Sequence, residues 1–441
     1  MGRPRRASSG LPADPPSNVG PAMSTLVERP DSPYISGNYD KHLKPSSKRR
    51  KARSLLRRYK QISLRHTWLN PLILVSVILA CYYANPGPQN PLHRAIFLSY
   101  PLGPDHPGGP VMYGKGKHDF TFVAFYTIVL SFTREFFTQR VIRPMAIRAG
   151  IRNRAKQYRF MEQVYTAMYF SVFGPFGLYV MSQGSLWYFN TTAMFEGFPH
   201  RSHEGVFKAY YLLQASYWSQ QAIVLMLLLE KPRKDFKELV LHHIITLALI
   251  FLSYRFHFAK MGIAVYITHD ISDFFLATSK TLNYLDSILV GPYFAFFIGV
   301  WIYLRHYLNL RILYATLTEF RTVGPFELNW DTQQYKCWIS QYITFGLLAS
   351  LQAVNLFWLF LILRIAKNFV FSSVDLKDER SEDEEDEEEE EKDGKAINDA
   401  ARKALENDTG MHTDKPVLLV NGEAIKPEAK PEGIRDRRRK G

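Results

Sequence analysis

Long apolar blocks constrain this chain more than any other feature of its sequence. Between about Leu69 and Phe371 they follow one another closely. Each is roughly 18 to 28 residues long, enough for a helix rising 1.5 Å per residue to cross the ~30 Å hydrocarbon core of a bilayer. Eight such blocks can be delimited, at 67–84, 119–136, 163–183, 209–229, 238–258, 264–285, 292–316 and 342–366. The sequence therefore predicts an all-α, polytopic membrane protein with about eight transmembrane helices.

The two ends of the chain differ sharply from this apolar middle. Residues 1–45 are rich in Pro, Ser and Gly, and residues 369–441 contain the acidic run RSEDEEDEEEEEK and end in RDRRRKG. Such compositions cannot bury enough apolar surface to fold, so we expect two disordered tails. Between them, 46–158 is a basic juxtamembrane segment with the first two transmembrane helices, and 159–368 carries the other six. No cleavable signal peptide is visible, so the first helix is expected to act as the targeting signal.

Lysine and arginine gather at particular ends of the predicted helices and so indicate their orientation. They concentrate before the first helix, between the second and third, and between the fourth and fifth, and basic flanks resist translocation. With eight spans, these regions share one side, so both termini are cytosolic and the connections 85–118, 184–208 and 317–341 are lumenal. The same pattern accounts for the net charge of +14 and gives no indication of a nucleic-acid partner. A eukaryotic secretory-pathway membrane is the expected location.

Two short motifs predict covalent modification. Asn190 begins an Asn-Thr-Thr sequon in a connection that would be lumenal, whereas the sequon at Asn407 would be cytosolic and unmodified. Ser381 is followed directly by acidic residues and is a candidate site for an acid-directed kinase; alternatively, the acidic run is only a solvated, self-repelling tail. The two cysteines, Cys81 and Cys337, are too few for a disulfide framework or a metal knuckle.

Ionisable residues at membrane depth cluster in the fifth and sixth blocks. The fifth contains His242 and His243 near its basic flank, and the sixth contains His269, Asp270 and Asp273. A charged group at the bilayer centre costs about 2.5–3.5 kcal/mol on insertion scales, so such groups face a partner or a cavity and indicate function by default. A helix-packing role explains one intramembrane histidine more readily than five polar groups on neighbouring helices.

Helical spacing predicts how these five side chains are grouped. His269 and Asp273 are four residues apart and Asp270 and Asp273 three, which places all three on one helix face. His242 and His243 diverge by about 100°, so one is expected to point at the reaction centre while the other supports it. The short link between the blocks makes an antiparallel hairpin, with His242 about 8 Å from Asp273 along its axis.

Histidine beside a carboxylate suits proton transfer or nucleophilic catalysis. The imidazole can act as a general base, or as an acylatable nucleophile that the carboxylate orients and makes more basic. A metal site is the rival interpretation, because His and Asp also bind metals. However, adjacent histidines do not place two imidazoles on one metal as a four-residue spacing would, and the HxxHH boxes of membrane di-iron enzymes are absent. We therefore expect no bound metal.

The stretch HHIITLALIFLSYRFHFAKMGIAVYITHDISDFFLATSKTLNYL resembles the signature of the longevity-assurance ceramide synthases. It contains in order a double His, a Thr three residues on, a Ser-Tyr pair, a Gly, the HDxxD motif, and a downstream Lys and Asn. The TLC domain that these enzymes share with TRAM-like and neuronal-lipofuscinosis-related proteins would cover 159–368. The lack of a homeobox-like insert and the acidic, serine-containing tail resemble the fungal branch. The chain departs from many animal members at 256–258, where Phe-His-Phe stands in a connection that usually contains Asn.

The resemblance implies an activity, a location and partners. Ceramide synthases transfer a long or very-long-chain acyl group from acyl-CoA to a sphingoid base, dihydrosphingosine or phytosphingosine, in the endoplasmic reticulum membrane. A thioester is already activated, so no cofactor is expected, but the largely protonated sphingoid amine requires a base. The resemblance implies that His242 is the nucleophile or base and that Asp273 is its partner. It also implies that His243, His269 and Asp270 orient the reacting groups, relay protons or stabilise the oxyanion. The fungal branch implies a small single-span regulatory subunit, and the assembly expected is a homodimer or a heterodimer with a paralogue.

Alternatives stay open at this level. Acyl transfer can pass through an acyl-histidine at His242, which we favour, or the histidine can act only as a base during direct transfer. The basic connection 134–159 suits the phosphates of CoA, or only reflects topology. A non-enzymatic, TRAM-like translocation or lipid-handling protein would have the same architecture, but it would not need the double histidine together with HDxxD.

Overall fold

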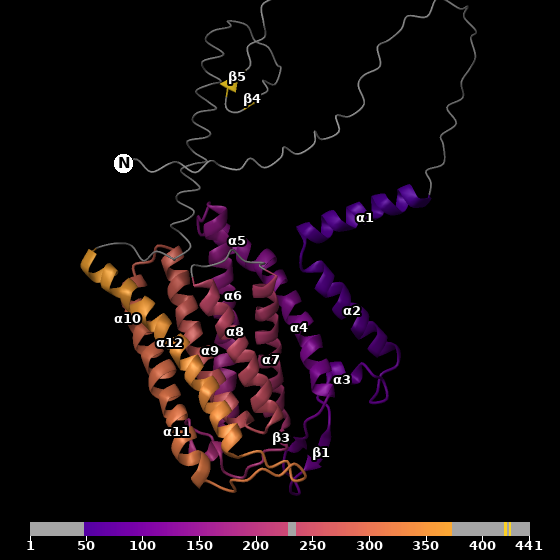
Figure 1. Cartoon of the computed structure of the whole chain (residues 1–441). Coiled ribbons are helices and arrows are strands. Elements are labelled where there is room, and N and C mark those ends of the chain that lie inside the picture. Colours follow the sequence, from indigo (N-terminus) through magenta and orange to yellow (C-terminus); the bar gives the residue numbers. More distant parts are fainter. Residues whose placement is uncertain (1–47, 228–234, 373–418, 421–422, 425–441) are drawn as a thin grey trace, which may run out of the picture. The chain divides into compact units, whose positions relative to one another are not determined.

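A computed structural model describes residues 48–227, 235–372, 419–420 and 423–424, and most of this part of the chain is helical (Figure 1). The helical elements are α1 (Lys48–Arg65), α2 (Leu69–Ala84), α3 (His93–Ile96), α4 (His118–Phe137), η1 (Thr138–Ile142), α5 (Arg143–Arg148), α6 (Arg154–Ser182), η2 (Thr192–Met194), α7 (Gly205–Met226), α8 (Phe236–Arg255), α9 (Ala259–Tyr284), α10 (Val290–Trp301), η3 (Ile302–Leu308), α11 (Asn309–Thr322) and α12 (Trp338–Ser372). The chain divides into two compact units, residues 1–59 and 60–441. The predicted helical architecture is confirmed.

Short strands lie in the connections between helices. β1 (Pro101–Pro104), β2 (Val111–Tyr113) and β3 (His203–Glu204) form an antiparallel sheet in that order, which joins the connections before α4 and before α7. β4 (Leu419–Val420) and β5 (Glu423–Ala424) form a separate antiparallel pair.

By length and composition, four helical segments among the described residues can cross a membrane. They are His118–Arg148, Arg154–Ser182, Phe236–Arg255 and Trp338–Phe371. The pair Leu56–Arg65 and Leu69–Ala84, bent by 105°, would make a fifth. All eight predicted blocks coincide with helices. However, α7, α9 and the run α10–η3–α11 do not meet the criteria of length and apolar composition for crossing a membrane. In α9 the reason is the HDxxD motif itself, whose polar side chains lower the hydropathy.

Little of the predicted tails belongs to the described residues. α12 continues to Ser372, four residues into the segment predicted as the C-terminal tail, 369–441. The segment 1–45 lies outside the described residues, as do Ser381 and Asn407.

Close packing of α6 on α9 positions the HDxxD motif. A Cβ atom on Gly177 would lie 2.7 Å from Ile267 Cγ1 and closer still to the hydroxyl of Tyr210, and one on Gly174 would lie 3.4 Å from Ile271 Cγ1. Small residues let helix backbones approach closely in membranes. The glycines of α6 therefore allow α9 to lie deep in the bundle.

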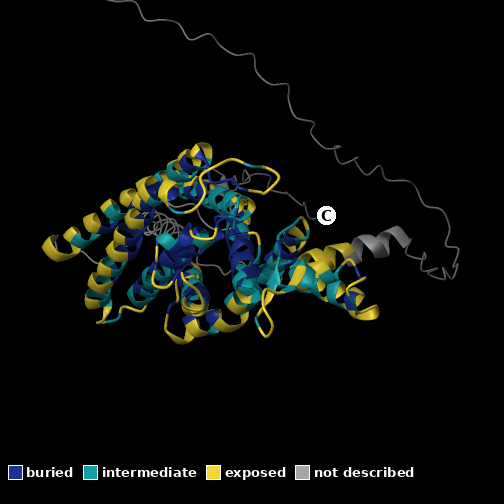
Figure 2. Cartoon of the chain, turned by 90° about the horizontal axis from the view of Figure 1, so that it is seen from below, coloured by how far each residue is buried: buried dark blue, intermediate teal, exposed yellow. Residues whose placement is uncertain are grey.

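The interior of the bundle is aromatic, while its outer faces are apolar and exposed. Tyr169 and Tyr217 stack with ring centroids 3.7 Å apart, and both are buried. Figure 2 shows blue interior residues and yellow outer faces, which include Val172 and Phe251 at 62 % and 50 % exposure. Broad exposed apolar surfaces of this kind suit contact with lipid.

A buried ion pair ties the connection before α4 to the ends of three helices. Lys208 Nζ lies 2.7 Å from Asp119 Oδ1 and donates to the carbonyl oxygens of Gly114 and Ser99 at 2.7 and 2.9 Å. The hydroxyl of Tyr254 donates to Asp119 Oδ2 at 2.9 Å. These contacts satisfy both charges and fix α4, α7 and α8 relative to one another.

Two buried histidines lie at the same end of the bundle, outside the helices. His200 Nδ1 is 3.2 Å from the carbonyl oxygen of His257, whose own Nδ1 is 3.2 Å from Lys115 Nζ. Burial, reinforced by nearby lysines, lowers the pKa of each histidine to about 4. Burial likewise lowers the pKa of Lys115 to about 7. The two histidines are therefore neutral near pH 7, and Lys115 loses its proton more easily than a lysine in water.

Candidate active site

His242 lies on α8 among three other rings. Its ring centroid is 5.1 Å from that of Trp358, 5.8 Å from Trp218 and 6.4 Å from His269. Its Nε2 is 3.5 Å from the hydroxyl of Thr246, one turn further along the helix. Its Nδ1 is buried and has no hydrogen-bond partner among the described residues. An unsatisfied buried polar atom in a folded protein calls for an explanation, and a catalytic role is one.

His243 is half-buried beside His242, with the two ring centroids 5.7 Å apart. Its Nδ1 lies 2.9 Å from the carbonyl oxygen of Leu239. A carbonyl oxygen can only accept, so Nδ1 carries the proton and Nε2 is the basic nitrogen. The backbone of α8 thus fixes the tautomer of the second histidine.

Both ring nitrogens of His269 are engaged. Nδ1 lies 2.8 Å from the carbonyl oxygen of Val265 and therefore donates, and Nε2 lies 3.3 Å from the amide nitrogen of Asn355 on α12. Its ring is inclined by only 22° to that of His242. This histidine is held in place on both sides, which suits a positioning role beside His242.

Asp273 forms a buried ion pair with Arg305. Arg305, on the π-helical segment η3, is 2 % exposed, and its Nη2 lies 2.5 Å from Asp273 Oδ1. Its Nε donates to Ser272 Oγ at 2.7 Å, and its Nη1 to Asn355 Oδ1 at 3.1 Å. In this structure a guanidinium, which is always protonated, meets the carboxylate, and the role of Asp273 as the partner of His242 stays a prediction.

Asp270 is separated from the other predicted residues. It is fully buried, and its Oδ2 accepts hydrogen bonds from the hydroxyl of Tyr210 at 3.2 Å and from the amide of Gln214, both on α7. A spacing of three residues rotates a side chain by 300°, so Asp270 and Asp273 diverge by about 60°. That divergence turns Asp270 away from the cavities toward α7, where it holds helices together.

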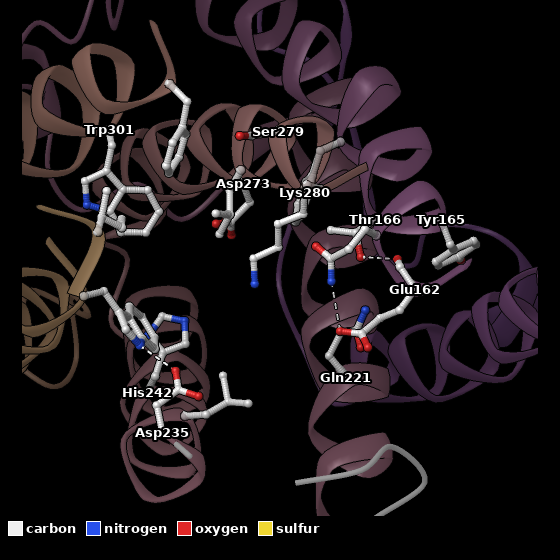
Figure 3. A pocket seen from close by; sticks show the side chains of 18 of the residues that line it. Glu162, Tyr165, Thr166, Gln221, Asp235, His242, Asp273, Ser279, Lys280 and Trp301 are labelled. Atoms are coloured by element: carbon white, nitrogen blue, oxygen red, sulfur yellow. Dashed lines mark hydrogen bonds between the residues drawn. The ribbon is translucent and has the colours of Figure 1, made fainter. Parts of the chain in front are cut away.

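A cavity of about 320 Å³ opens beside His242 (Figure 3); it is called the polar cavity here because polar side chains are set among its largely apolar walls. His242, His243, Asp273 and Arg305 line it. In Figure 3, Lys280 extends into its open centre. Further polar lining comes from α6, α7 and α9, namely Glu162, Gln163, Thr166, Gln221, Ser279, Lys280 and Asn283. Polar groups thus surround the space in front of the histidines.

An apolar cavity of about 220 Å³ starts at the same histidine. Its walls come from α7, α8, α9, α12 and the connection before α12, and they include His269, Thr246 and Cys337. Only His242 and Trp218 line both cavities. The part of α8 along this cavity, from His242 to Phe256, rises roughly 21 Å. His242 therefore lies at the junction of a polar and an apolar space.

Several residues of the site were missed from the sequence. Arg305 is the plainest, since an arginine within the block 292–316 is a charge at membrane depth and could have been singled out by the same rule as the histidines. Asn355 and Trp358 on α12 carry no comparable signal. Trp358 stacks edge-on against His242 and donates its indole N–H to Asp235 Oδ2 at 2.9 Å.

The arrangement suits acid–base or nucleophilic chemistry. The rings of His242 and His243 stand at 89° to each other. In the described part of the chain no three His, Cys, Asp or Glu residues are grouped to hold a metal ion. His242 lines both cavities, and its Nδ1 makes no competing hydrogen bond among the described residues.

Known proteins similar to this chain carry the same domain. The family model described as the TLC domain matches residues 159–364, close to the predicted 159–368. A sphingosine N-acyltransferase-like protein of Gibberella moniliformis, FUM17, is 50 % identical over 367 residues, which cover 82 % of this chain and 94 % of that protein.

Two yeasts provide similarly close relatives. The sphingosine N-acyltransferase lac1 of Schizosaccharomyces pombe is 50 % identical over 76 % of this chain and 87 % of its own length. The ceramide synthase LAG1 of Saccharomyces cerevisiae is 49 % identical over 74 % of this chain and 78 % of its own length. With identity at this level along most of both chains, the protein belongs to the TLC-domain family of sphingosine N-acyltransferases.

Proposed function

We propose that this protein is a ceramide synthase, which transfers a long or very-long-chain acyl group from acyl-CoA to the amine of a sphingoid base. The observation that carries the proposal is the place of His242 at the junction of the two cavities. A reaction between a polar thioester head and an amine, each attached to a hydrocarbon chain, needs a reactive group where polar and apolar spaces meet. The reaction uses neither metal nor cofactor, because the thioester is already activated.

The covalent route assigns His242 the role of nucleophile. One ring nitrogen attacks the thioester carbonyl and the C–S bond breaks; the proton on the other ring nitrogen passes to the sulfur, and CoA leaves as the thiol. The acyl-imidazole is then attacked by the neutral amine of the sphingoid base. The amide bond forms, the N–C bond to histidine breaks, and the amine proton passes to the released imidazole. In the direct route His242 only accepts that proton.

Other residues position His242 and the substrates. His269 lies beside it and contacts Asn355, and Arg305 holds Asn355 and Asp273 together. The polar cavity suits the thioester end of acyl-CoA and the amine and hydroxyl groups of the sphingoid base. Arg134, within the basic connection 134–159, and Lys280 line this cavity and supply positive charge near the phosphates of CoA.

The apolar cavity suits the acyl tail. Its wall along α8 is roughly 21 Å long, more than the ~15 Å thickness of one leaflet of a ~30 Å hydrocarbon core. A wall of this length can enclose a long acyl group. Its far end is formed partly by Trp330 and Tyr335 in the connection before α12, so this connection sets the depth available.

The proposed setting is the endoplasmic reticulum membrane, with eight spans and both termini in the cytosol. Asn190 is exposed and would be glycosylated in the lumen, and Ser381 would be phosphorylated by an acid-directed kinase. The assembly would include a small single-span regulatory subunit, with two copies or a copy and a paralogue together. A glycosidase-sensitive mobility shift that the natural sequence shows and Asn190→Gln lacks would support this topology. No such shift in the natural sequence would contradict the modification.

The first experiment gives purified membranes containing this chain, with its regulatory subunit, a labelled long-chain acyl-CoA and no sphingoid base. Intact-protein mass spectrometry then looks for an acyl adduct, which dihydrosphingosine should discharge as ceramide. The adduct should be absent in His242→Ala and retained in a control variant at the outer face, Val172→Ala.

Each outcome of this experiment separates two interpretations. His242-dependent ceramide without an adduct would favour direct transfer. No ceramide from any acyl-CoA and base would favour the non-enzymatic, TRAM-like interpretation.

A further inference from the structure

α1 is a strongly basic helix, and all of its apolar residues except Leu64, which is 70 % exposed among the basic positions, lie on one side. Its eighteen residues contain nine Lys or Arg and no Asp or Glu. At 100° per residue, the apolar positions 52, 55, 56, 59 and 62 fall within about one third of the helix circumference. Of the nine basic positions, only 48 falls in that third. The helix therefore has one apolar stripe and a wide basic face.

The apolar stripe is exposed in the part of α1 whose side chains the structure describes. Leu56 is 68 % exposed, Tyr59 48 % and Ile62 49 %. A helix with this pattern normally places its apolar side against another surface.

Membrane topology alone does not explain this arrangement. Basic residues before the first span would orient it through their number, whatever their place around a helix. Segregating them from an apolar stripe is required only if the helix lies on a surface. α1 is also not continuous with α2, because the helix breaks after Arg65 and the segment Leu56–Arg65 is bent by 105° from Leu69–Ala84.

The sequence supplies a physical reason for this break. Pro71 lies in the first turn of α2, and its ring would clash with the carbonyl group four residues earlier if the helix ran through unbroken. α1 and α2 are thus separate helices joined by three residues.

We infer that α1 binds the surface of an anionic membrane. Its apolar stripe enters the boundary between headgroups and acyl chains, and its basic face contacts the phosphate and carboxylate groups of anionic lipids. The chain's own acidic run around 380–391 is the rival occupant. It would match the charge but leave Leu56, Tyr59 and Ile62 in water, whereas a bilayer satisfies both faces. The three-residue link to a candidate membrane helix also keeps α1 close to the bilayer.

The test places spin labels on opposite sides of α1 in the full chain. Cys81 and Cys337 are first replaced by Ala, and single cysteines are then introduced as Ile62→Cys or Lys60→Cys, which lie about 160° apart around the helix. The protein is reconstituted in nanodiscs of phosphatidylcholine, with or without phosphatidylserine. Collisions of the label with oxygen and with a water-soluble nickel chelate report lipid and water exposure. The readout does not depend on acyl transfer, so it is independent of the proposed activity.

Binding predicts a contrast between the two positions. In phosphatidylserine nanodiscs the label at position 62 should gain oxygen contact and lose nickel contact, while the label at position 60 stays in water. Raised salt should weaken the change, and Arg57→Gln with Arg58→Gln should reduce it. Equal exposure of position 62 in both nanodiscs would overturn the inference. Shielding of position 62 that disappears on deletion of 380–391, whatever the lipid, would show that the acidic run is the occupant.

Discussion

The guanidinium of Arg305 and the carboxylate of Asp273 meet inside the bundle, with Nη2 and Oδ1 2.5 Å apart. Arg305 also donates to Asn355, whose amide contacts His269. His269 in turn lies beside His242. One ion pair thus joins η3, α9 and α12 around the residue proposed to react.

Replacing Arg305 by Met should reduce both stability and activity. It leaves the half-buried carboxylate of Asp273 without its cation, which costs less than the ~3–5 kcal/mol of a fully buried charge, and it frees Asn355 and His269. Thermal unfolding in detergent and ceramide formation should both show the loss. Adding Asp273→Leu removes the second charge and should recover most of the stability but not the activity. An active double variant would show that the pair serves folding alone.

Changing the far end of the apolar cavity should change the preferred acyl length in opposite directions. Phe256→Ala lengthens the space and Val265→Phe shortens it, since both side chains line it. Two methylenes gained or lost are worth about 1.6 kcal/mol, so the ratio of kcat/KM for acyl-CoAs differing by two carbons should move more than tenfold. Competition between labelled acyl-CoAs measures it. Val172→Phe, on the outer face of α6, is the control, and a shift there would argue against the cavity.

Gly177 and Gly174 should respond differently to alanine. At Gly177 the added methyl group would strike Tyr210 and Ile267, and the shift of Tyr210 would loosen its hydrogen bond to Asp270. At Gly174 the methyl group meets only Ile271, at 3.4 Å. We expect Gly177→Ala to cost about 1–3 kcal/mol, as overpacking does, and Gly174→Ala much less. Equal unfolding temperatures for the two variants would contradict the close α6–α9 packing.

His200 and His257 should make the protein less stable in mild acid. The pKa of each is lowered from 6.5 in an unfolded chain to about 4 in the folded one, so between these values the unfolded state binds more protons. The free energy of unfolding should therefore fall as pH drops from 6.5 toward 4, by at most about 1.4 kcal/mol per pH unit for each histidine. Unfolding temperatures across this range in detergent provide the measurement.

His257→Gln should flatten this acid dependence. His106→Gln is the matched control, because His106 is exposed and its replacement should leave the dependence unchanged. The same slope in all three proteins would exclude His257 as its cause.

Hydropathy predicted the helices well because it reflects a physical requirement that acts along the chain. Each apolar block must bury itself in lipid or protein whatever its neighbours are, and each coincides with a helix. The polar residues of α8 and α9 stood out for the same reason, and His242, His243 and Asp273 do share a cavity.

Helical periodicity could not predict which residues on different helices contact one another. Spacing placed Asp270 and Asp273 together, yet they bind different elements, because a divergence of about 60° brings Asp270 to Gln214 on α7 and Asp273 to Arg305 on η3. Asn355 and Trp358 lie in an apolar block that gives no indication of the site. Only the packing of α12 against α8 brings them to His242.

The apolar cavity that begins at His242 encloses a tail in protein instead of lipid. The length of an acyl chain bound there is limited by fixed side chains and not by the thickness of the surrounding bilayer. A few residues of the cavity wall then determine the distribution of chain lengths in the product. A single substitution among them can alter the lipid composition of a whole membrane.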